Sequence, residues 1–228
     1  MLGSKSICRV VWRGVVKVDK VVSNCDLSTY PLRRFILGGA RSGKSRYAEQ
    51  LATELARTRG QRVVVIATAQ PDDEEMQARI AHHQQQRPHD WITIEEPIQL
   101  GAALAQVALE HGSTAQECDA GVIILVDCLT VWLSNLLFSE ARDYPEIGHI
   151  EPPACFAEQR AHLLEVLSTG LSGSEVILVS NEVGQGIIPQ GAVSRWFVDE
   201  AGRLNQAVAA ICNRVILVVA GLPLVVKG

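Results

Sequence analysis

The sequence predicts a single α/β domain in which a mainly parallel β-sheet is flanked by helices. Four nearly continuous aliphatic runs, rich in valine and isoleucine, are typical of strands that are buried on both faces of a parallel sheet. These strands are expected at 63–66, 122–126, 176–179 and 215–219. Helical patterns separate the runs, and alternation of strands with helices favours an open α/β sheet.

Two weaker strand signals complete the expected sheet. Residues 35–37 form a short apolar run before a glycine cluster, and residues 222–226 are expected to form an edge strand. Helices are expected at 43–59, 72–86, 97–111, 129–142, 154–169 and 192–212. Loops are expected at 112–120 and 143–153, where polar residues, glycine and proline gather.

Composition excludes several classes of protein. The chain has 228 residues, of which 47% are hydrophobic and 20% charged, as in globular domains. No apolar run approaches the roughly 18 residues of a membrane-spanning helix, so no transmembrane segment is expected. The six cysteines are scattered, which argues against a disulfide framework and a structural zinc site. The N-terminal stretch is a poor secretory signal, and we therefore expect a cytoplasmic protein.

Charge is distributed unevenly along the chain. Residues 1–34 contain seven of the 21 lysines and arginines but only two aspartates, so the rest of the chain is acidic. An acidic body argues against nucleic-acid binding, which requires a basic face. We divide the chain into an N-terminal extension of unknown role, residues 1–34, and a P-loop domain, residues 35–228.

The domain assignment depends on one complete motif, G-x-x-x-x-G-K-[ST], which predicts a phosphate-binding loop. Backbone N–H groups of such a loop surround phosphate oxygens, and the following helix contributes its positive N-terminal dipole. The strand expected before the motif and the helix after it distinguish it from an ordinary glycine-rich turn. Lys44 is expected to reach the β- and γ-phosphates, and the Ser45 hydroxyl to coordinate Mg²⁺. The motif consists of Gly38, Gly39, Ala40, Arg41, Ser42, Gly43, Lys44 and Ser45.

Asp127 closes the strand expected at 122–126 and is the candidate second magnesium ligand. The alternative is that Asp127 caps the N-terminus of the following helix, and one side chain could not readily fill both roles. The chain carries no Asn-Lys-x-Asp element of the kind that reads guanine in switch GTPases. A switch GTPase is therefore disfavoured.

Two adjacent histidines, His82 and His83, lie near the end of the helix expected at 72–86. Solvated histidines near a helix C-terminus are common. Beside a P-loop, however, a neutral imidazole can attack phosphorus and form a phosphoramidate. Attack on the γ-phosphate would give a phosphohistidine, and attack on the α-phosphate a nucleotidyl-histidine. Spacing alone does not choose between these products.

Several separate motifs, in order, make the chain resemble the bifunctional adenosylcobinamide kinase/adenosylcobinamide-phosphate guanylyltransferase family. The resemblance covers about residues 34–227. It comprises the P-loop, Ala67-Thr68, the segment from Asp73 to Pro88 with both histidines, Asp127-Cys128-Leu129-Thr130 before Asn135-Leu136-Leu137, Ser180 to Pro189, and Arg195 to Gln206. The resemblance implies a P-loop NTPase-like, RecA-like fold.

The resemblance also implies an activity. Family members phosphorylate adenosylcobinamide with ATP or GTP and then transfer GMP from GTP, by way of a guanylylated histidine, to form adenosylcobinamide-GDP for cobalamin biosynthesis. The histidine position matches His82. The resemblance further implies a homotrimer that uses Mg²⁺ with its nucleotide and has no tightly bound organic cofactor. Nucleotide or metal contacts are implied for the P-loop and for Ala67, Thr68, Ala69, His83, Gln84, Gln85, Gln86, Glu95 and Asp127.

Some alternatives stay open at this point. Residues 181–186 follow a predicted strand and either shape the corrinoid or nucleotide pocket or form a structural glycine-rich loop. Trp132 and Trp196 are expected to be packing residues rather than a platform for the corrinoid. A P-loop small-molecule kinase without nucleotidyl transfer is the main competing function. A nucleotide-binding regulatory module is a weaker one.

Overall fold

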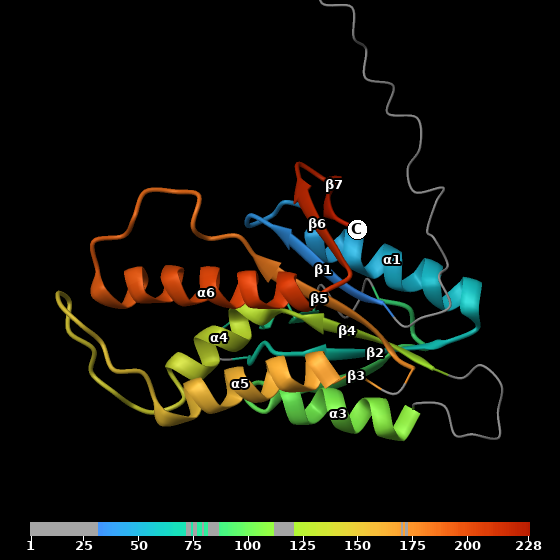
Figure 1. The fold of residues 1–228 in the computed structure, drawn as a ribbon, viewed down its shortest axis with the longest axis horizontal. Helices are drawn as coiled ribbons and strands as arrows, with labels where there is room; N and C mark the ends of the chain where they lie inside the picture. The colour runs from blue at the N-terminus through green and yellow to red at the C-terminus, as the bar shows by residue number, and fades with distance from the viewer. Residues whose placement is uncertain are drawn as a thin grey trace, which may run out of the picture.

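The computed structural model contains one α/β domain built on a seven-stranded sheet (Figure 1). It describes residues 32–71, 74, 77, 78, 80, 81, 87–111, 121–169, 171 and 173–228. The strands are β1 (Arg33–Gly38), β2 (Arg62–Ala67), β3 (Ile92–Glu95), β4 (Val122–Asp127), β5 (Glu175–Asn181), β6 (Arg214–Val219) and β7 (Leu222–Lys227). The helices are α1 (Lys44–Arg59), α3 (Leu100–His111), α4 (Leu129–Leu137), α5 (Ala154–Thr169) and α6 (Ala192–Ile211).

The strand order is β3-β2-β4-β5-β1-β6-β7, and every neighbouring pair is parallel except β6 and β7. The carboxyl ends of six strands therefore meet at one edge. At that edge β5 separates β1, which leads into the P-loop, from β4, which ends in Asp127. The mainly parallel α/β sheet and the P-loop NTPase-like, RecA-like class predicted from the sequence are confirmed.

Two apolar layers cover the sheet. Alternate side chains of the central strands point to opposite faces, as the two-residue period of a strand requires. Helix α1 covers one face and packs Leu51 and Leu55 against Val65 and Ile123. Helices α3, α4, α5 and α6 contribute to the core on the other face (Figure 1). This second layer buries Trp132 completely, and Trp196 packs edge-to-face on Phe156, which confirms both as packing residues.

The predicted strands are all present, but β3 at Ile92–Glu95 was not predicted. It is a short edge strand whose side chains are largely exposed, so it lacks the apolar run that identified the others. The loop at 143–153 contains no helix or strand, as predicted. The loop at 112–120 lies outside the described residues. Of the helix predicted at 72–86, residues 74, 77, 78, 80 and 81 are described, and all are helical.

Two predicted helices were too long. The one expected from 97 begins at Leu100, because the Glu96 carboxylate accepts hydrogen bonds from the N–H groups of Ile98 and Gln99, at 2.9 and 2.6 Å. The other was expected to reach 142 but ends at Leu137. The Tyr144 hydroxyl donates to the Leu137 carbonyl at 2.7 Å and satisfies this terminal acceptor.

The boundary between extension and domain also moves. Strand β1 begins at Arg33, two residues inside the segment that the sequence analysis assigned to the extension. The Arg34 side chain is only 2% exposed and forms an ion pair with Glu175, which is fully buried and also pairs with Arg59. Arg33 and Arg34 therefore belong to the folded domain.

This boundary predicts different outcomes for two truncations. A chain that begins at residue 32 should keep its fold, its thermal stability and the activities proposed below. A chain that begins at residue 35 leaves Glu175 with one cation and removes backbone pairs of β1. In the longer chain, Arg34→Met alone should cost about 3 kcal/mol, or about 6–12 °C in Tm, because it removes one of the two cations that pair with the fully buried Glu175. Thermal denaturation measures this loss, and equal Tm values for Arg34→Met and its parent would contradict it.

Candidate active site

The P-loop is a tight turn between β1 and α1 that leaves no room for side chains at two of its glycines. A Cβ on Gly38 would lie 2.4 Å from Ser42 Oγ and 2.6 Å from the Val218 carbonyl oxygen. Gly43 has φ +91°, a conformation that L-residues rarely adopt. The Ser42 carbonyl accepts a hydrogen bond from the Gly221 N–H at 2.8 Å, so the β6–β7 turn supports the loop. Gly38 and Gly43 are thus required by the geometry.

Two polar groups of this loop are buried without an adequate partner. Lys44 is 9% exposed, and its Nζ contacts only the Gly39 carbonyl, at 3.3 Å, among the described residues. Burial lowers the pKa of Lys44, and the nearby negative charge of Asp127 opposes this shift. The Ser42 hydroxyl is also buried and has no hydrogen-bond partner. A buried cation with a single carbonyl partner and a buried hydroxyl with none suit an anionic ligand such as a nucleotide phosphate.

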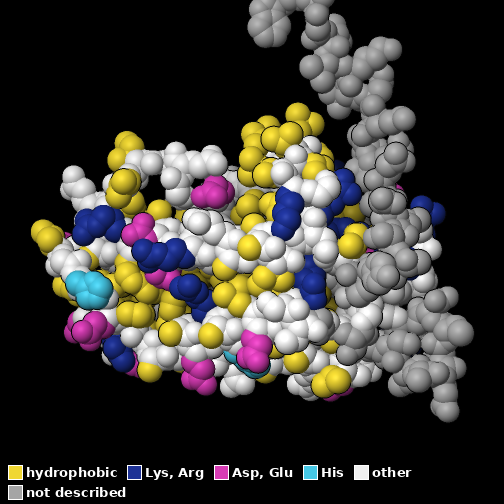
Figure 2. Space-filling model, viewed as in Figure 1, with side chains coloured by type: hydrophobic (Ala, Val, Ile, Leu, Met, Phe, Trp, Pro, Cys, Tyr) yellow, Lys and Arg dark blue, Asp and Glu magenta, His cyan; other side chains and the backbone are white. Residues whose placement is uncertain are grey.

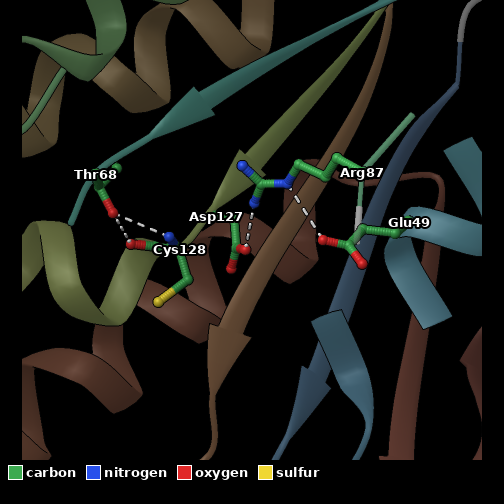
Figure 3. Close-up of polar contacts among 5 residues, drawn as sticks. All are labelled: Glu49, Thr68, Arg87, Asp127 and Cys128. Carbon is green, nitrogen blue, oxygen red and sulfur yellow. Dashed lines mark hydrogen bonds and ion pairs between the residues drawn. The ribbon is translucent and has the colours of Figure 1, made fainter. Parts of the chain in front are cut away.

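Asp127 does not cap helix α4, because Cys128 occupies the N-cap position. The carboxylate of Asp127 instead accepts a hydrogen bond from Arg87 at 3.0 Å, and the same guanidinium contacts Glu49 of α1 at 3.3 Å (Figure 3). All three side chains are largely buried, with exposed fractions of 7% for Arg87, 12% for Glu49 and 14% for Asp127. Arg87 therefore links the P-loop helix to the carboxyl end of β4.

Neither Arg87 nor Glu49 is predicted from the sequence to have a role at the site. The two residues are 38 positions apart, and Asp127 lies 40 positions beyond Arg87, so no local pattern relates them. The available signal was Arg87 itself, a basic residue next to Pro88 in the motif that follows the paired histidines. A cation near a predicted metal carboxylate became evident only through the fold.

The segment after β2 joins the same edge of the sheet. Ala67, the last residue of β2, pairs with Asp127 on one side and with Glu95 on the other. Thr68 is fully buried, and its hydroxyl donates to the Cys128 carbonyl at 2.8 Å and accepts from the Cys128 N–H at 2.9 Å (Figure 3). Thr68 thus aligns the ends of β2 and β4 and holds the backbone beside Asp127.

The structure therefore brings together many of the residues implied by the family resemblance. The P-loop, Ala67, Thr68 and Asp127 lie along one edge, and Glu95 lies at its outer strand with an exposed side chain. Ala69, which is half-buried, directly follows Thr68. The remaining candidates are outside the described residues, and their roles stay predictions. They are His82, His83, Gln84, Gln85 and Gln86.

The loop that follows β5 lies at this edge as well. The Glu182 N–H donates to the Gly38 carbonyl at 3.1 Å, so the loop begins against the P-loop. Farther along, Ile187 and Ile188 are 98% and 74% exposed. The loop thus begins against the P-loop and exposes two apolar side chains farther along.

Comparison with known proteins identifies the family. The family model described as cobinamide kinase / cobinamide phosphate guanyltransferase matches residues 34–226. This chain belongs to that family. The family is consistent with the nucleotide-binding P-loop and with the carboxylate at the end of β4.

Curated relatives agree with this assignment. The bifunctional adenosylcobalamin biosynthesis protein CobP of Pseudomonas aeruginosa is 48% identical over 86% of this chain and 98% of its own length. The CobU proteins of Escherichia coli and Salmonella typhimurium are 37% and 36% identical, each over 84% of this chain and 98% of its own length.

A comparison with solved structures finds an ATPase from a bacterial type III secretion system. It superposes on 82% of this chain and 50% of its own, with a TM-score of 0.48 and 14% identity.

The Arg87 cluster predicts a measurable contribution to stability in this family member. Arg87→Gln leaves two largely buried carboxylates without their shared cation, and we expect a loss of about 2 kcal/mol, or about 4–8 °C in Tm. The control is Arg142→Gln, which breaks the exposed pair between Arg142 and Glu140, with exposed fractions of 38% and 46%. The control should lower Tm by less than about 2 °C. Equal shifts in thermal denaturation would contradict the structural importance of Arg87.

Proposed function

We propose that this protein phosphorylates adenosylcobinamide with ATP or GTP and then transfers GMP from GTP to the new phosphate. The product is adenosylcobinamide-GDP, an intermediate of cobalamin biosynthesis. The observation that carries the proposal is the P-loop, whose buried Lys44 has no carboxylate partner among the described residues, in a chain that belongs to the cobinamide kinase family. Lys44 would lie against the β- and γ-phosphates and balance their charge.

Magnesium is the proposed companion of the nucleotide. The Ser45 hydroxyl and the Asp127 carboxylate are oxygen ligands of the kind that Mg²⁺ prefers, and both belong to the carboxyl edge of the sheet. Arg87 occupies one oxygen of Asp127, Oδ2, and none of the described donors contacts the other. When bound, the ion would neutralise negative charge on the phosphates. The proposed ligands thus fit the ion chemically.

His82 is the proposed nucleophile of the second reaction. The imidazole nitrogen attacks the α-phosphorus of GTP, pyrophosphate leaves, and the resulting guanylyl-histidine then passes GMP to the corrinoid phosphate. The covalent intermediate divides one transfer between two anions into two easier steps. His83 and Gln84, Gln85 and Gln86 are proposed to contact the nucleotide.

The position of Arg87 supports this role for His82. Arg87 follows His82 by five residues, a separation that spans at most about 18 Å in an extended chain. Arg87 is attached to α1 and to Asp127, which flank the proposed phosphate site. A histidine connected to that site by so short a segment can accept the guanylyl group from the α-phosphate of GTP.

We further propose that the protein is a cytoplasmic homotrimer, as the family resemblance implies. No described helix is both long and apolar enough to cross a membrane. Apolar side chains on and beside strand β7 support self-association (Figure 2), since large exposed apolar patches often mark protein interfaces. They are Val219, Leu222, Leu224, Val225 and Val226, each 46–64% exposed.

The exposed loop residues Ile187 and Ile188 are proposed to face the apolar part of the corrinoid.

Two radiolabels test the proposed reactions. GTP labelled on the α-phosphate should give an acid-labile, base-stable protein adduct, and GTP labelled on the γ-phosphate should transfer its label to adenosylcobinamide. A small-molecule kinase without nucleotidyl transfer would label only the corrinoid, and a regulatory nucleotide-binding module would label neither. If the protein binds nucleotide but gives neither the labelled adduct nor the labelled corrinoid, the proposal is overturned.

A further inference from the structure

Arg87 contacts one proposed metal ligand, Asp127, and the helix that carries the other, Ser45. Its guanidinium donates to Asp127 Oδ2 at 3.0 Å and to Glu49 Oε1 at 3.3 Å (Figure 3). Glu49 follows Ser45 by four residues in α1, a spacing that places both side chains on one face of the helix. A cation of the protein itself is therefore bound at the carboxylate that is proposed to bind Mg²⁺.

Four largely buried charges around Asp127 cancel one another. Asp127 and Glu49 contribute two carboxylates, and Arg87 and Lys44 contribute two cations. Lys44 lies close enough to Asp127 for their charges to interact. Because these side chains are largely buried, salt and water screen their charges little. A divalent cation that entered alone would add two uncompensated positive charges and would meet the Arg87 guanidinium at the same carboxylate.

A bound nucleotide changes this balance. Its triphosphate brings several negative charges, which the P-loop N–H groups and the N-terminus of α1 are suited to bind. A metal ion that accompanies the phosphates then adds positive charge where negative charge has arrived. The contact with Glu49 gives Arg87 a second partner, so the guanidinium can leave Asp127 without becoming an unpaired buried cation.

We propose that Arg87 excludes Mg²⁺ from Asp127 until a nucleotide is bound. This inference rests on the proposed function and gives Arg87 a positioning role, because it acts through Asp127 and not on the reacting atoms. Metal and nucleotide are then expected to bind cooperatively, since the phosphates offset the charge by which Arg87 opposes the metal. The ligand-free protein should bind free Mg²⁺ weakly.

Binding of Mn²⁺ to the nucleotide-free protein tests the proposal. Mn²⁺ suits the same oxygen ligands as Mg²⁺ and is detected by electron paramagnetic resonance. Arg87→Gln should bind Mn²⁺ at least about tenfold more tightly than the unmodified protein, because it removes a nearby like charge. Arg87→Lys keeps the charge and should stay within about threefold of the unmodified protein. With a non-hydrolysable GTP analogue bound, the difference between Arg87→Gln and the unmodified protein should also fall below about threefold.

Thermal denaturation gives a second measurement on the same variants. Mg²⁺ alone should raise the Tm of Arg87→Gln, because the metal replaces the missing cation at Asp127, and it should leave the Tm of the unmodified protein nearly unchanged. If Arg87→Gln is unfolded without metal, Mg²⁺ should restore its fold. Failure of Mg²⁺ to stabilise or restore this variant would contradict the proposal.

Two controls locate the effect. Asp127→Asn added to Arg87→Gln should abolish the gain in Mn²⁺ binding, which places the metal at Asp127. Arg142→Gln removes an arginine from the exposed pair with Glu140 and should not change Mn²⁺ binding. Equal Mn²⁺ affinities of Arg87→Gln and the unmodified protein, including undetectable binding by both, would overturn the inference, as would weaker binding by Arg87→Gln. These measurements need no turnover, so their failure is distinguishable from failure of the proposed function in the radiolabel experiment.

Discussion

Replacement of His82 by alanine should abolish the acid-labile GMP adduct and leave adenosylcobinamide phosphorylation within about threefold of the unmodified protein. The imidazole is needed only for attack on the α-phosphorus, whereas the kinase reaction uses the substrate hydroxyl as nucleophile. Loss of a covalent nucleophile should lower the overall rate of GMP transfer by at least about 10⁴-fold. Gel analysis with α-labelled GTP and separate product analysis with γ-labelled GTP measure the two reactions.

The adjacent histidine provides a matched control. His83→Ala removes the same imidazole one residue away, and we expect weaker GTP binding with the adduct retained. An adduct that persists in His82→Ala, or one that is lost in His83→Ala alone, would assign the nucleophile to a residue other than His82. Loss of the kinase reaction in His82→Ala would show that His82 also serves the first step.

Lys44→Met should lower both reactions by at least about 100-fold, because each depends on charge stabilisation at the phosphates. The same substitution should raise the Tm of the ligand-free protein by about 2–4 °C, the effect of about 1 kcal/mol in a domain of this size. Burial lowers the pKa of Lys44, so the folded protein carries an unfavourable buried charge that methionine avoids. Activity and stability are thus expected to change in opposite directions.

The pH dependence of this effect has a defined sign. Because the pKa of Lys44 is lowered on folding, the charged lysine costs stability below its folded pKa, and the cost disappears as pH rises from there toward the ordinary value of 10.5. The Tm difference between Lys44→Met and the unmodified protein should therefore be largest near neutral pH and shrink in alkali. A difference that grows with pH would contradict the burial argument.

Ligand-induced stabilisation completes this test. Mg²⁺ and GTP at about 100 times Kd should stabilise the unmodified protein by about 2.7 kcal/mol, or about 5–10 °C. Lys44→Met should lose this increase. Lys227→Met removes the other described lysine, which is exposed and contacts the end of α6, and it should keep the ligand-induced increase. Equal ligand responses in the two variants would contradict the role of Lys44.

Prediction from sequence worked best where structure depends on neighbouring residues. The buried strands were found because continuous aliphatic runs report burial directly, as in Val122–Asp127. Strand β3 was missed because its edge position leaves most of its side chains exposed. The end of α4 was misplaced because Tyr144, seven residues later, satisfies the carbonyl of Leu137. Errors of this kind arise where contacts from beyond the element decide its limits.

For the site, the chemical roles of single residues could be predicted from the local sequence pattern. Motif spacing was sufficient to predict a phosphate-binding loop with Lys44, and Asp127 was identified as an acid that follows a buried strand. Both predictions depend on local sequence alone: the spacing of the P-loop motif, and the position of an acidic residue directly after an apolar run. The family resemblance then supplied His82 and the substrates, because several motifs in one order are more specific than one loop.

The relations among these residues come from packing between distant segments. Arg34 pairs with Glu175 at a separation of 141 residues, Arg87 joins Glu49 to Asp127, and Asn181 meets Gly38 through the register of β1 and β5. Local pattern carries no information about such pairs, because strand order and register are set by long-range burial. Desolvation is likewise a property of the packed domain, and it is what leaves the buried cation of Lys44 in need of an anionic ligand.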